Sequence, residues 1–308
     1  MVIVAGKGGV GKTTVAAALA RMAAREGLSA LVVQVERSSS MAALFGRPPL
    51  TYMESTLSPA AGTVAEVRGR TITPDDALLE YLEDHGLRRI SRRLVSTGAM
   101  DVVSTAAPGI KDILILGKVK ALERSSAADL IVLDAPAAGH AITFLLSVRG
   151  LLDAVRVGPI NAQASDVLEM LTDPDRCSVV LVTLPEETPV NELVETAFSL
   201  EDRVGISLGP VVVNGLYATL AGIETPPEQA ASAAGATLRP GEATALAEAA
   251  GFRRHRQELQ GDQLRRLAEL LPMPQLRLPF LFAADLGASH VDILASALRN
   301  QVSELSDT

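Results

Sequence analysis

The chain has 308 residues, which is enough for one large α/β domain or two small ones with a sizeable buried core. Hydrophobic residues make up 48% and charged residues 21%, so the composition fits neither a disordered chain nor a coiled coil. The net charge of −8 and the isoelectric point near 5.1 argue against broad, charge-driven binding to nucleic acid or anionic membrane.

The cysteine count and the hydropathy pattern exclude further classes of protein. Cys177 is the single cysteine, which excludes an intramolecular disulfide and a Cys-only zinc or iron–sulfur site within one chain. Residues 1–6 lack the basic start and long apolar core of a signal peptide. The uncharged window 204–223 contains Pro210, Asn214 and four glycines, so a strand with flanking loops fits it better than a membrane helix. We therefore expect a cytoplasmic protein with no integral membrane segment.

In chain order, short and almost wholly apolar runs alternate with helical patterns. Such runs are typical of strands buried on both faces of a parallel sheet, and the predicted ones are Val2–Ala5, Ala30–Val35, Leu130–Leu133, Ser178–Thr183 and Pro210–Asn214. The predicted helices are Lys12–Arg25, Pro74–Leu94, Ile110–Glu123, Val190–Arg203, Ala243–Leu271 and Ser289–Leu305. This alternation predicts an α/β fold with a doubly wound, mainly parallel sheet.

Two stretches interrupt the alternation. Residues from about 50 to 122 and from about 143 to 171 are predicted to be mainly helical, with no clear strand between. We expect them to form a helical subdomain inserted beside the sheet, within a single domain spanning 1–308. Residues 224–241 are rich in Ala, Pro, Ser and Gly and predict a surface loop.

The strongest motif follows the first predicted strand and opens the first predicted helix. It has the form G-x-x-x-x-G-K-[ST] and consists of Gly6, Lys7, Gly8, Gly9, Val10, Gly11, Lys12, Thr13 and Thr14. Its glycines allow backbone N–H groups to surround phosphate oxygens, and the helix N-terminus adds partial positive charge. Lys12 is expected to bind the β- and γ-phosphates, and Thr13 to offer its hydroxyl to Mg²⁺.

Lys7 narrows the class of P-loop. The form K-G-G-x-G-K-T resembles the signature-lysine (deviant Walker A) ATPases, whose extra lysine reaches across a dimer to the partner's nucleotide. The chain has five lysines against 23 arginines, yet two of the five lie in this loop. A slim point charge suits a crowded phosphate better than the planar fork of arginine. The alternative is a solvated surface lysine.

Further segments resemble the arsenical pump-driving ATPase family (the ArsA/GET branch). Residues 36–46 are similar to the family's switch I, Pro108-Gly109 to the P-G pair before a helix, and residues 134–140 to switch II. The resemblance continues through 211–214 and 278–280, so it covers nearly the whole chain. It implies a P-loop NTPase fold, with ATP and Mg²⁺ as cofactors.

The resemblance also assigns roles to individual residues. Asp134 ends an apolar strand, where its carboxylate can hold Mg²⁺ through bound waters alongside Thr13. Asn214 resembles the family's adenine-reading asparagine, with Pro279 and Phe280 closing over the base. For Asn214 the alternative is an ordinary turn residue at a strand end.

Both switch segments depart from the family pattern. Switch I has Glu36 and Arg37 where the family has aspartate and proline, although Glu36 keeps the family's spacing to Gly46. Glu36 therefore stays the candidate for orienting the attacking water, beside Lys7 and Lys12 as catalytic residues. Its extra methylene moves the carboxylate by about an ångström, and a misplacement of that size can cost roughly 10²-fold, so we expect slow hydrolysis. Switch II has an alanine pair in place of P-T, and its His140 is expected to order the segment rather than act as a base.

The client of such an ATPase is less evident. Arsenite binding is disfavoured because a soft metalloid needs two or three thiolates, and the C-x-x-C zinc pair of the eukaryotic members is absent. Apolar stripes at 110–119 and 144–152 fit either core or a groove for a protein client. The seven methionines are scattered, which favours core or interface over such a groove.

Two functions stay open. One is a dimeric ATPase whose nucleotide state controls a protein or membrane-associated partner. The other is a weakly hydrolysing regulatory subunit that pairs with a paralogous ATPase, so the dimer is either a homodimer or a heterodimer. A cell-division or plasmid-partition ATPase is disfavoured, because the tail 289–308 is neither a basic amphipathic helix nor a DNA-binding patch.

Overall fold

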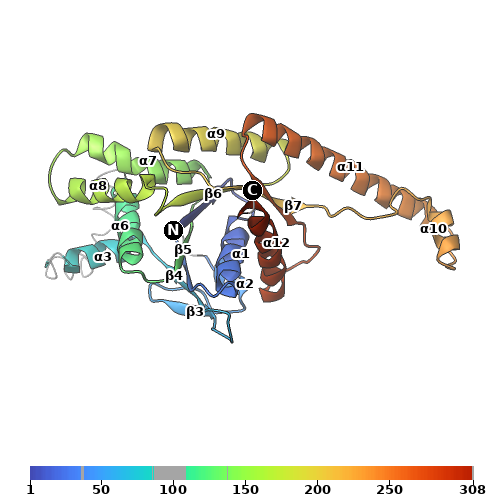
Figure 1. Ribbon diagram of the computed structural model, residues 1–308, viewed down its shortest axis with the longest axis horizontal. Coiled ribbons are helices and arrows are strands. Elements are labelled where there is room, and N and C mark those ends of the chain that lie inside the picture. Colours follow the sequence, from blue (N-terminus) through green and yellow to red (C-terminus); the bar gives the residue numbers. More distant parts are fainter. Residues whose placement is uncertain (36–37, 85, 87–108, 137, 307–308) are drawn as a thin grey trace.

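The computed structural model describes residues 1–35, 38–84, 86, 109–136 and 138–306 (Figure 1). Within these residues the fold is α/β, built on a mixed, mainly parallel sheet of eight strands in the order β3-β4-β2-β5-β1-β6-β7-β8. All neighbouring strands of this described sheet run parallel except β3 and β4. The strands are β1 (Val2–Gly6), β2 (Ala30–Gln34), β3 (Ser55–Ser58), β4 (Val67–Thr71), β5 (Leu130–Asp134), β6 (Ser178–Thr183), β7 (Val211–Leu216) and β8 (Gln275–Pro279). The predicted fold class is confirmed.

Helices cover both faces of the sheet. They are α1 (Lys12–Arg25), α2 (Ser40–Leu44), α3 (Pro74–Asp84), α6 (Ile110–Arg124), α7 (Ala138–Ala154), α8 (Pro159–Thr172), α9 (Glu187–Val204), α10 (Pro227–Ala233), α11 (Glu242–Leu270) and α12 (Ala288–Ser306). One face of β1 and β2, with Ile3 and Leu31, joins the core formed by α6, α7, α8 and α9. The other face, with Val4 and Val32, joins the core formed by α1 and α12. Burial on both faces explains why the central strands are continuous apolar runs.

The prediction of a mainly helical stretch over 50–122 is wrong in its first part. That part forms β3 and β4, which extend the sheet beyond β2. The sequences S-T-L-S and V-R-G-R-T lack the apolar signature of a buried strand, because β3 is an edge strand and Arg70 is a buried arginine packed over the Tyr52 ring. The prediction of one domain with a helical insertion stays a prediction, with α7 and α8 lying in its 143–171 part.

The C-terminal half adds two further differences. Residues 275–279 form β8, an edge strand whose residues alternate between buried and more exposed positions. Residues 224–241, predicted as a loop, contain the short helix α10. The window 204–223 contains β7, as its proline and glycines indicate. In the described part of the chain, no helix combines the length and apolar character needed to cross a bilayer.

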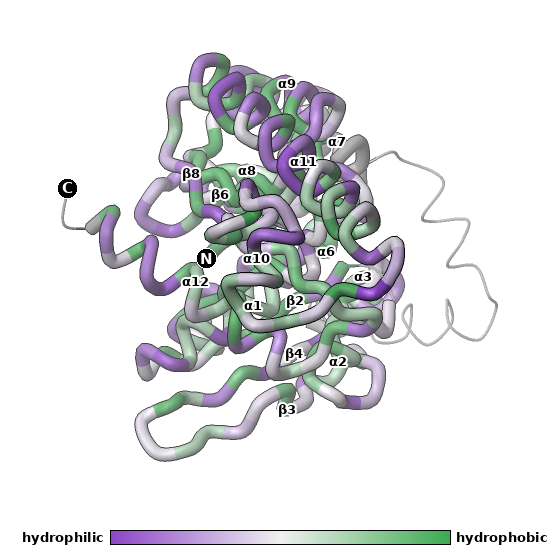
Figure 2. The backbone as a smooth tube through the Cα atoms, turned by 90° about the vertical axis from the view of Figure 1, so that its right-hand side faces the viewer, coloured by the Kyte–Doolittle hydropathy of each residue, from purple (hydrophilic) through white to green (hydrophobic). Residues whose placement is uncertain are grey.

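Helix α11 projects from the body of the protein and carries α10 near its far end (Figure 1). Over its 29 residues, all of them described, only Gln260 and Leu267 are buried. Figure 2 shows hydrophilic residues, in purple, along α11 and α9. The outer half of α11 is therefore a solvent-exposed arm rather than a cover for the sheet.

Candidate nucleotide site

The glycine-rich loop connects β1 to α1. A side chain is disfavoured at each of several of its glycines, for different steric reasons. Gly6 has φ +154°, and a Cβ there would lie 2.3 Å from the Val182 carbonyl oxygen. Gly9 and Gly11 have φ +85° and +91°, in the left-handed region that L side chains rarely adopt. The Val10 side chain is buried between them and anchors the loop, while Gly8 and Gly9 are exposed. The loop thus has the strand–loop–helix setting that a phosphate cradle needs.

Three predicted residues meet where the loop enters α1. The Thr13 hydroxyl donates to Asp134 Oδ2 at 2.8 Å, and Asp134 is buried at the end of β5, in register with Val4 of β1. The Lys12 ammonium donates to the Lys7 carbonyl oxygen at 3.1 Å, which folds its side chain back along the loop. Hydroxyl and carboxylate oxygens are the donors that Mg²⁺ prefers, so Thr13 and Asp134 fit this ion. Thr14 follows in the first turn of α1.

Lys7 pairs with a residue of its own chain. Its Nζ lies 2.5 Å from Glu192 Oε1 on α9, and both side chains are a little more than one-third exposed. Glu192 was not singled out in the sequence, since the two residues are 185 positions apart and no motif links them.

Asn214 contacts the phosphate loop directly. Its Nδ2 donates to the Val10 carbonyl oxygen at 3.0 Å, and a Cβ on Gly11 would lie 2.3 Å from the same nitrogen. The glycine therefore leaves the space that the asparagine amide occupies. This contact gives Asn214 a loop-holding role, and its reading of adenine stays a prediction.

An aromatic cluster lies beside Asn214, at the carboxyl ends of β7 and β8. Phe280 follows Pro279, is 43% exposed, and packs edge-on against Tyr217 with ring centroids 5.2 Å apart. Phe282 lies 4.7 Å from the Phe280 ring, and the Arg253 guanidinium lies 5.4 Å from the Tyr217 ring. Of these, the sequence singled out Pro279 and Phe280. The others come from the loops after β7 and β8 and from α11, which only the fold brings together.

The predicted switch residues are described only in part. Glu36, Arg37, Pro108 and Ala137 lie outside the described residues, and so does the side chain of His140 in the first turn of α7. Gly109 begins α6 with φ +87°, a conformation that favours glycine.

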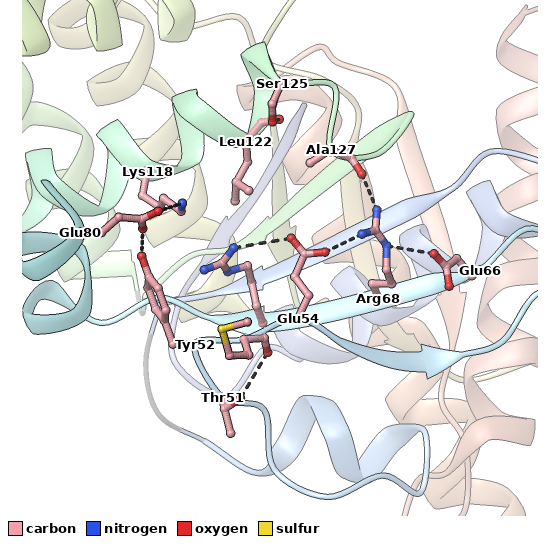
Figure 3. Close-up of polar contacts among 12 residues, drawn as sticks. Thr51, Tyr52, Glu54, Glu66, Arg68, Glu80, Lys118, Leu122, Ser125 and Ala127 are labelled. Carbon is pink, nitrogen blue, oxygen red and sulfur yellow. Dashed lines mark hydrogen bonds and ion pairs between the residues drawn. The ribbon is translucent and has the colours of Figure 1, made fainter. Parts of the chain in front are cut away.

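A polar network connects the loop between α2 and β3 with helices α3 and α6. Tyr52 donates to Glu80 on α3, which also accepts from Lys118 on α6 (Figure 3). Burial and the Glu80 contact raise the pKa of Tyr52, so it remains a phenol at neutral pH. Burial alone would raise the pKa of Glu80, but the hydrogen bonds from Lys118 and Tyr52 lower it below its usual value. The network therefore places a charged carboxylate between the loop that precedes β3 and helices α3 and α6.

Known proteins resemble this chain in its sequence. The family model of the anion-transporting ATPases matches residues 1–157, which is half of the chain. The ATPase BagA of Mycobacterium tuberculosis is 36% identical over 219 residues, covering 69% of this chain and 64% of the relative. The putative arsenical pump-driving ATPase of Halobacterium salinarum is 30% identical over 230 residues, 68% of this chain and 34% of that protein. An arsenical pump-driving ATPase of Escherichia coli is 29% identical over 222 residues, 70% and 35% respectively.

The chain thus spans less than two thirds of the length of these relatives. The matched region includes the phosphate loop and Asp134, which together carry the geometry described above. With its fold, its P-loop and its family match in agreement, the chain belongs to the anion-transporting (ArsA) ATPase family.

Proposed function

We propose that this protein binds Mg·ATP, hydrolyses it slowly in the cytoplasm, and uses its nucleotide state to control a dimer and a protein or membrane-associated partner. The observation that carries the proposal is the contact between Thr13 and Asp134 beside the glycine-rich loop. Lys12 would bind the β- and γ-phosphates, and the loop amides would surround them. Bound Mg²⁺ would neutralise charge on these phosphates while the γ-phosphoryl group is transferred to water.

Glu36 is the proposed group for orienting the attacking water. Its position in the sequence, two residues after β2, supports this role. The longer glutamate side chain in place of aspartate is the reason to propose a slow reaction.

The proposed dimer depends on Lys7. With two-fold symmetry, each Lys7 would leave Glu192 and bind the partner's phosphates. An ion pair of this exposure contributes only about 0–1 kcal/mol, so exchanging it for a nucleotide contact is energetically accessible.

A second candidate is a regulatory subunit that pairs with a paralogous ATPase. The Lys7–Glu192 pair supports it, because a lysine that stayed paired within its own chain would not reach the nucleotide of a twin subunit. Light scattering after mixing with a paralogue would detect the heterodimer.

The test is molecular mass by light scattering with Mg·ATP, with Mg·ADP and without nucleotide, with phosphate release followed in parallel. Wild type is compared with Lys7→Ala and with Lys111→Ala, a surface lysine on α6. An ATP-strengthened dimer that Lys7→Ala loses and Lys111→Ala keeps would support the proposal. A monomer in every state, with no phosphate released, would contradict the homodimeric ATPase.

A further inference from the structure

Three polar residues form a row across adjacent strands beside the proposed magnesium site. Gln34, the last residue of β2, is in register with Asp134 of β5 on one side and with Thr71 of β4 on the other. Neighbouring parallel strands lie about 4.8 Å apart, and residues in register point to the same face. Val32 and Val132, two positions earlier, belong to the core under α1, so the row lies on the face that α1 covers.

The row is buried, yet part of its hydrogen-bonding capacity is unused. Gln34 and Thr71 are each 3% exposed. Among the described residues, neither Gln34 Oε1 nor Thr71 Oγ1 has a hydrogen-bond partner. A buried acceptor without a donor costs free energy, which favours a role for this acceptor in a bound state.

The row runs from the proposed magnesium site to a cavity. At one end, Asp134 receives the Thr13 hydroxyl at the start of α1. At the other end, Thr71 lines a cavity of about 590 Å³ together with Ser38 and Ser39, which lie within the segment similar to switch I. Gln34 lies between the two, so a donor that reaches its amide oxygen can be a water molecule.

We propose that Gln34 is a positioning residue for Mg²⁺: its amide oxygen accepts a hydrogen bond from a water bound to the ion that Thr13 and Asp134 hold. The inference rests on the proposed function, since it requires Mg·nucleotide at this site. Mg²⁺ keeps several waters when a protein binds it, and each of these waters is a hydrogen-bond donor that needs an acceptor. Residues in such outer-shell positions typically contribute 10- to 100-fold to metal affinity.

The test is the affinity for Mg²⁺ of the protein–nucleotide complex, measured by titrating Mg²⁺ against a fluorescent ATP analogue. Gln34→Met keeps the length of the side chain and removes the acceptor, whereas Gln34→Glu restores an acceptor at the same place. We expect Gln34→Met to weaken Mg²⁺ binding about 10- to 100-fold while nucleotide affinity without Mg²⁺ stays unchanged. Gln34→Glu should recover most of the loss.

The matched control is Gln275→Met on β8. Gln275 also has an amide oxygen that lacks a partner among the described residues, but it begins a strand at the far edge of the sheet. This variant should bind Mg²⁺ as wild type does. Thermal melting without ligand separates the roles further, because removing an unused buried acceptor should leave the melting temperature of Gln34→Met unchanged or raise it.

Gln34→Asn serves as a second variant if Gln34→Met does not fold. It withdraws the amide by one methylene and should weaken Mg²⁺ binding in the same direction. Full retention of the wild-type Mg²⁺ affinity by a folded Gln34→Met or Gln34→Asn would overturn the inference about Gln34 and leave the proposed function standing. A wild-type protein whose nucleotide affinity does not respond to Mg²⁺ would overturn the inference together with the proposed function.

Discussion

The Lys7 ammonium on the phosphate loop forms an ion pair with the Glu192 carboxylate on α9, with 2.5 Å between Nζ and Oε1. The pair is partly exposed, so its contribution is about 0–1 kcal/mol. It nevertheless fixes where the lysine lies when a chain is alone. In the proposed dimer, a nucleotide of the neighbouring subunit would have to compete with Glu192 for this charge.

Glu192→Gln should therefore strengthen the proposed ATP-dependent dimer. Each dimer breaks two such pairs, so removing competitors worth at most about 1 kcal/mol each is expected to tighten dimerisation up to about 30-fold and to raise phosphate release. Analytical ultracentrifugation with Mg·ATP measures the change. The matched control is Glu195→Gln, an exposed glutamate on the same helix, which should behave as wild type. A dimer affinity equal in Glu192→Gln and wild type would show that the pair does not restrain Lys7.

Gly11→Ala should abolish nucleotide binding. The new Cβ would lie 2.3 Å from Asn214 Nδ2 at a φ of +91°, so both the loop and the asparagine must move. Isothermal titration with ATP measures the loss. Gly241→Ala is the control, because Gly241 also begins a helix with a left-handed φ of +85° but has nothing within 4 Å of the added Cβ. It should lose about 1–2 kcal/mol of stability and keep its nucleotide affinity.

Phe280→Ala should weaken binding of the adenine base of ATP, over which Phe280 is predicted to close, without affecting the phosphate contacts. Stacking of a base on an aromatic ring is worth about 1–3 kcal/mol, so ATP and ADP affinities should both fall about 5- to 150-fold. Competition between ATP and inorganic triphosphate separates base from phosphate, since triphosphate affinity should not change. Phe252→Ala, on a more exposed ring of α11, is the control. Equal losses for ATP and triphosphate would argue against stacking on Phe280.

Acid should destabilise the protein in part through Glu123. Its carboxylate accepts two hydrogen bonds from Arg176, at 3.0 and 2.8 Å, which lower its pKa. A depressed folded-state pKa gives stability that is present above the unfolded value of about 4.3 and is lost as pH falls through the folded value. Glu123→Gln should therefore cost about 1 kcal/mol, or about 2 °C in melting temperature, at pH 7. The difference from wild type should vanish at low pH, while exposed Glu201→Gln changes little at any pH.

Cys177 should be unreactive in the folded protein. The residue is 1% exposed, and burial raises the pKa of its thiol to about 12, so almost no thiolate exists at neutral pH. Labelling with iodoacetamide at pH 8 should be slow in buffer and fast in guanidinium chloride. Arsenite should neither protect the thiol nor alter phosphate release. Rapid labelling of the native protein would contradict this burial.

The sequence predicted the positions of the glycine-rich loop and of Asp134 better than the edges of the fold. Gly6 to Thr14 form a local motif, and Asp134 ends a strand that is recognisable by its apolar run, so both could be placed without a structure. Strands β3, β4 and β8 escaped prediction because an edge strand or a strand with buried arginine lacks that run. Glu192 and Tyr217 escaped for another reason, since they belong to no motif and lie far along the sequence from their partners Lys7 and Phe280.

The projecting half of α11 has a consequence for local unfolding. A helix of 29 residues is about 43 Å long, yet its first half and the neighbouring α10, both described throughout, contain no buried residue. Short helices without tertiary support are marginal in water, so this arm should open independently of the sheet. Its backbone amides should exchange with deuterium long before those of β1, and a protease should cut first after Arg239, leaving the nucleotide-binding core intact.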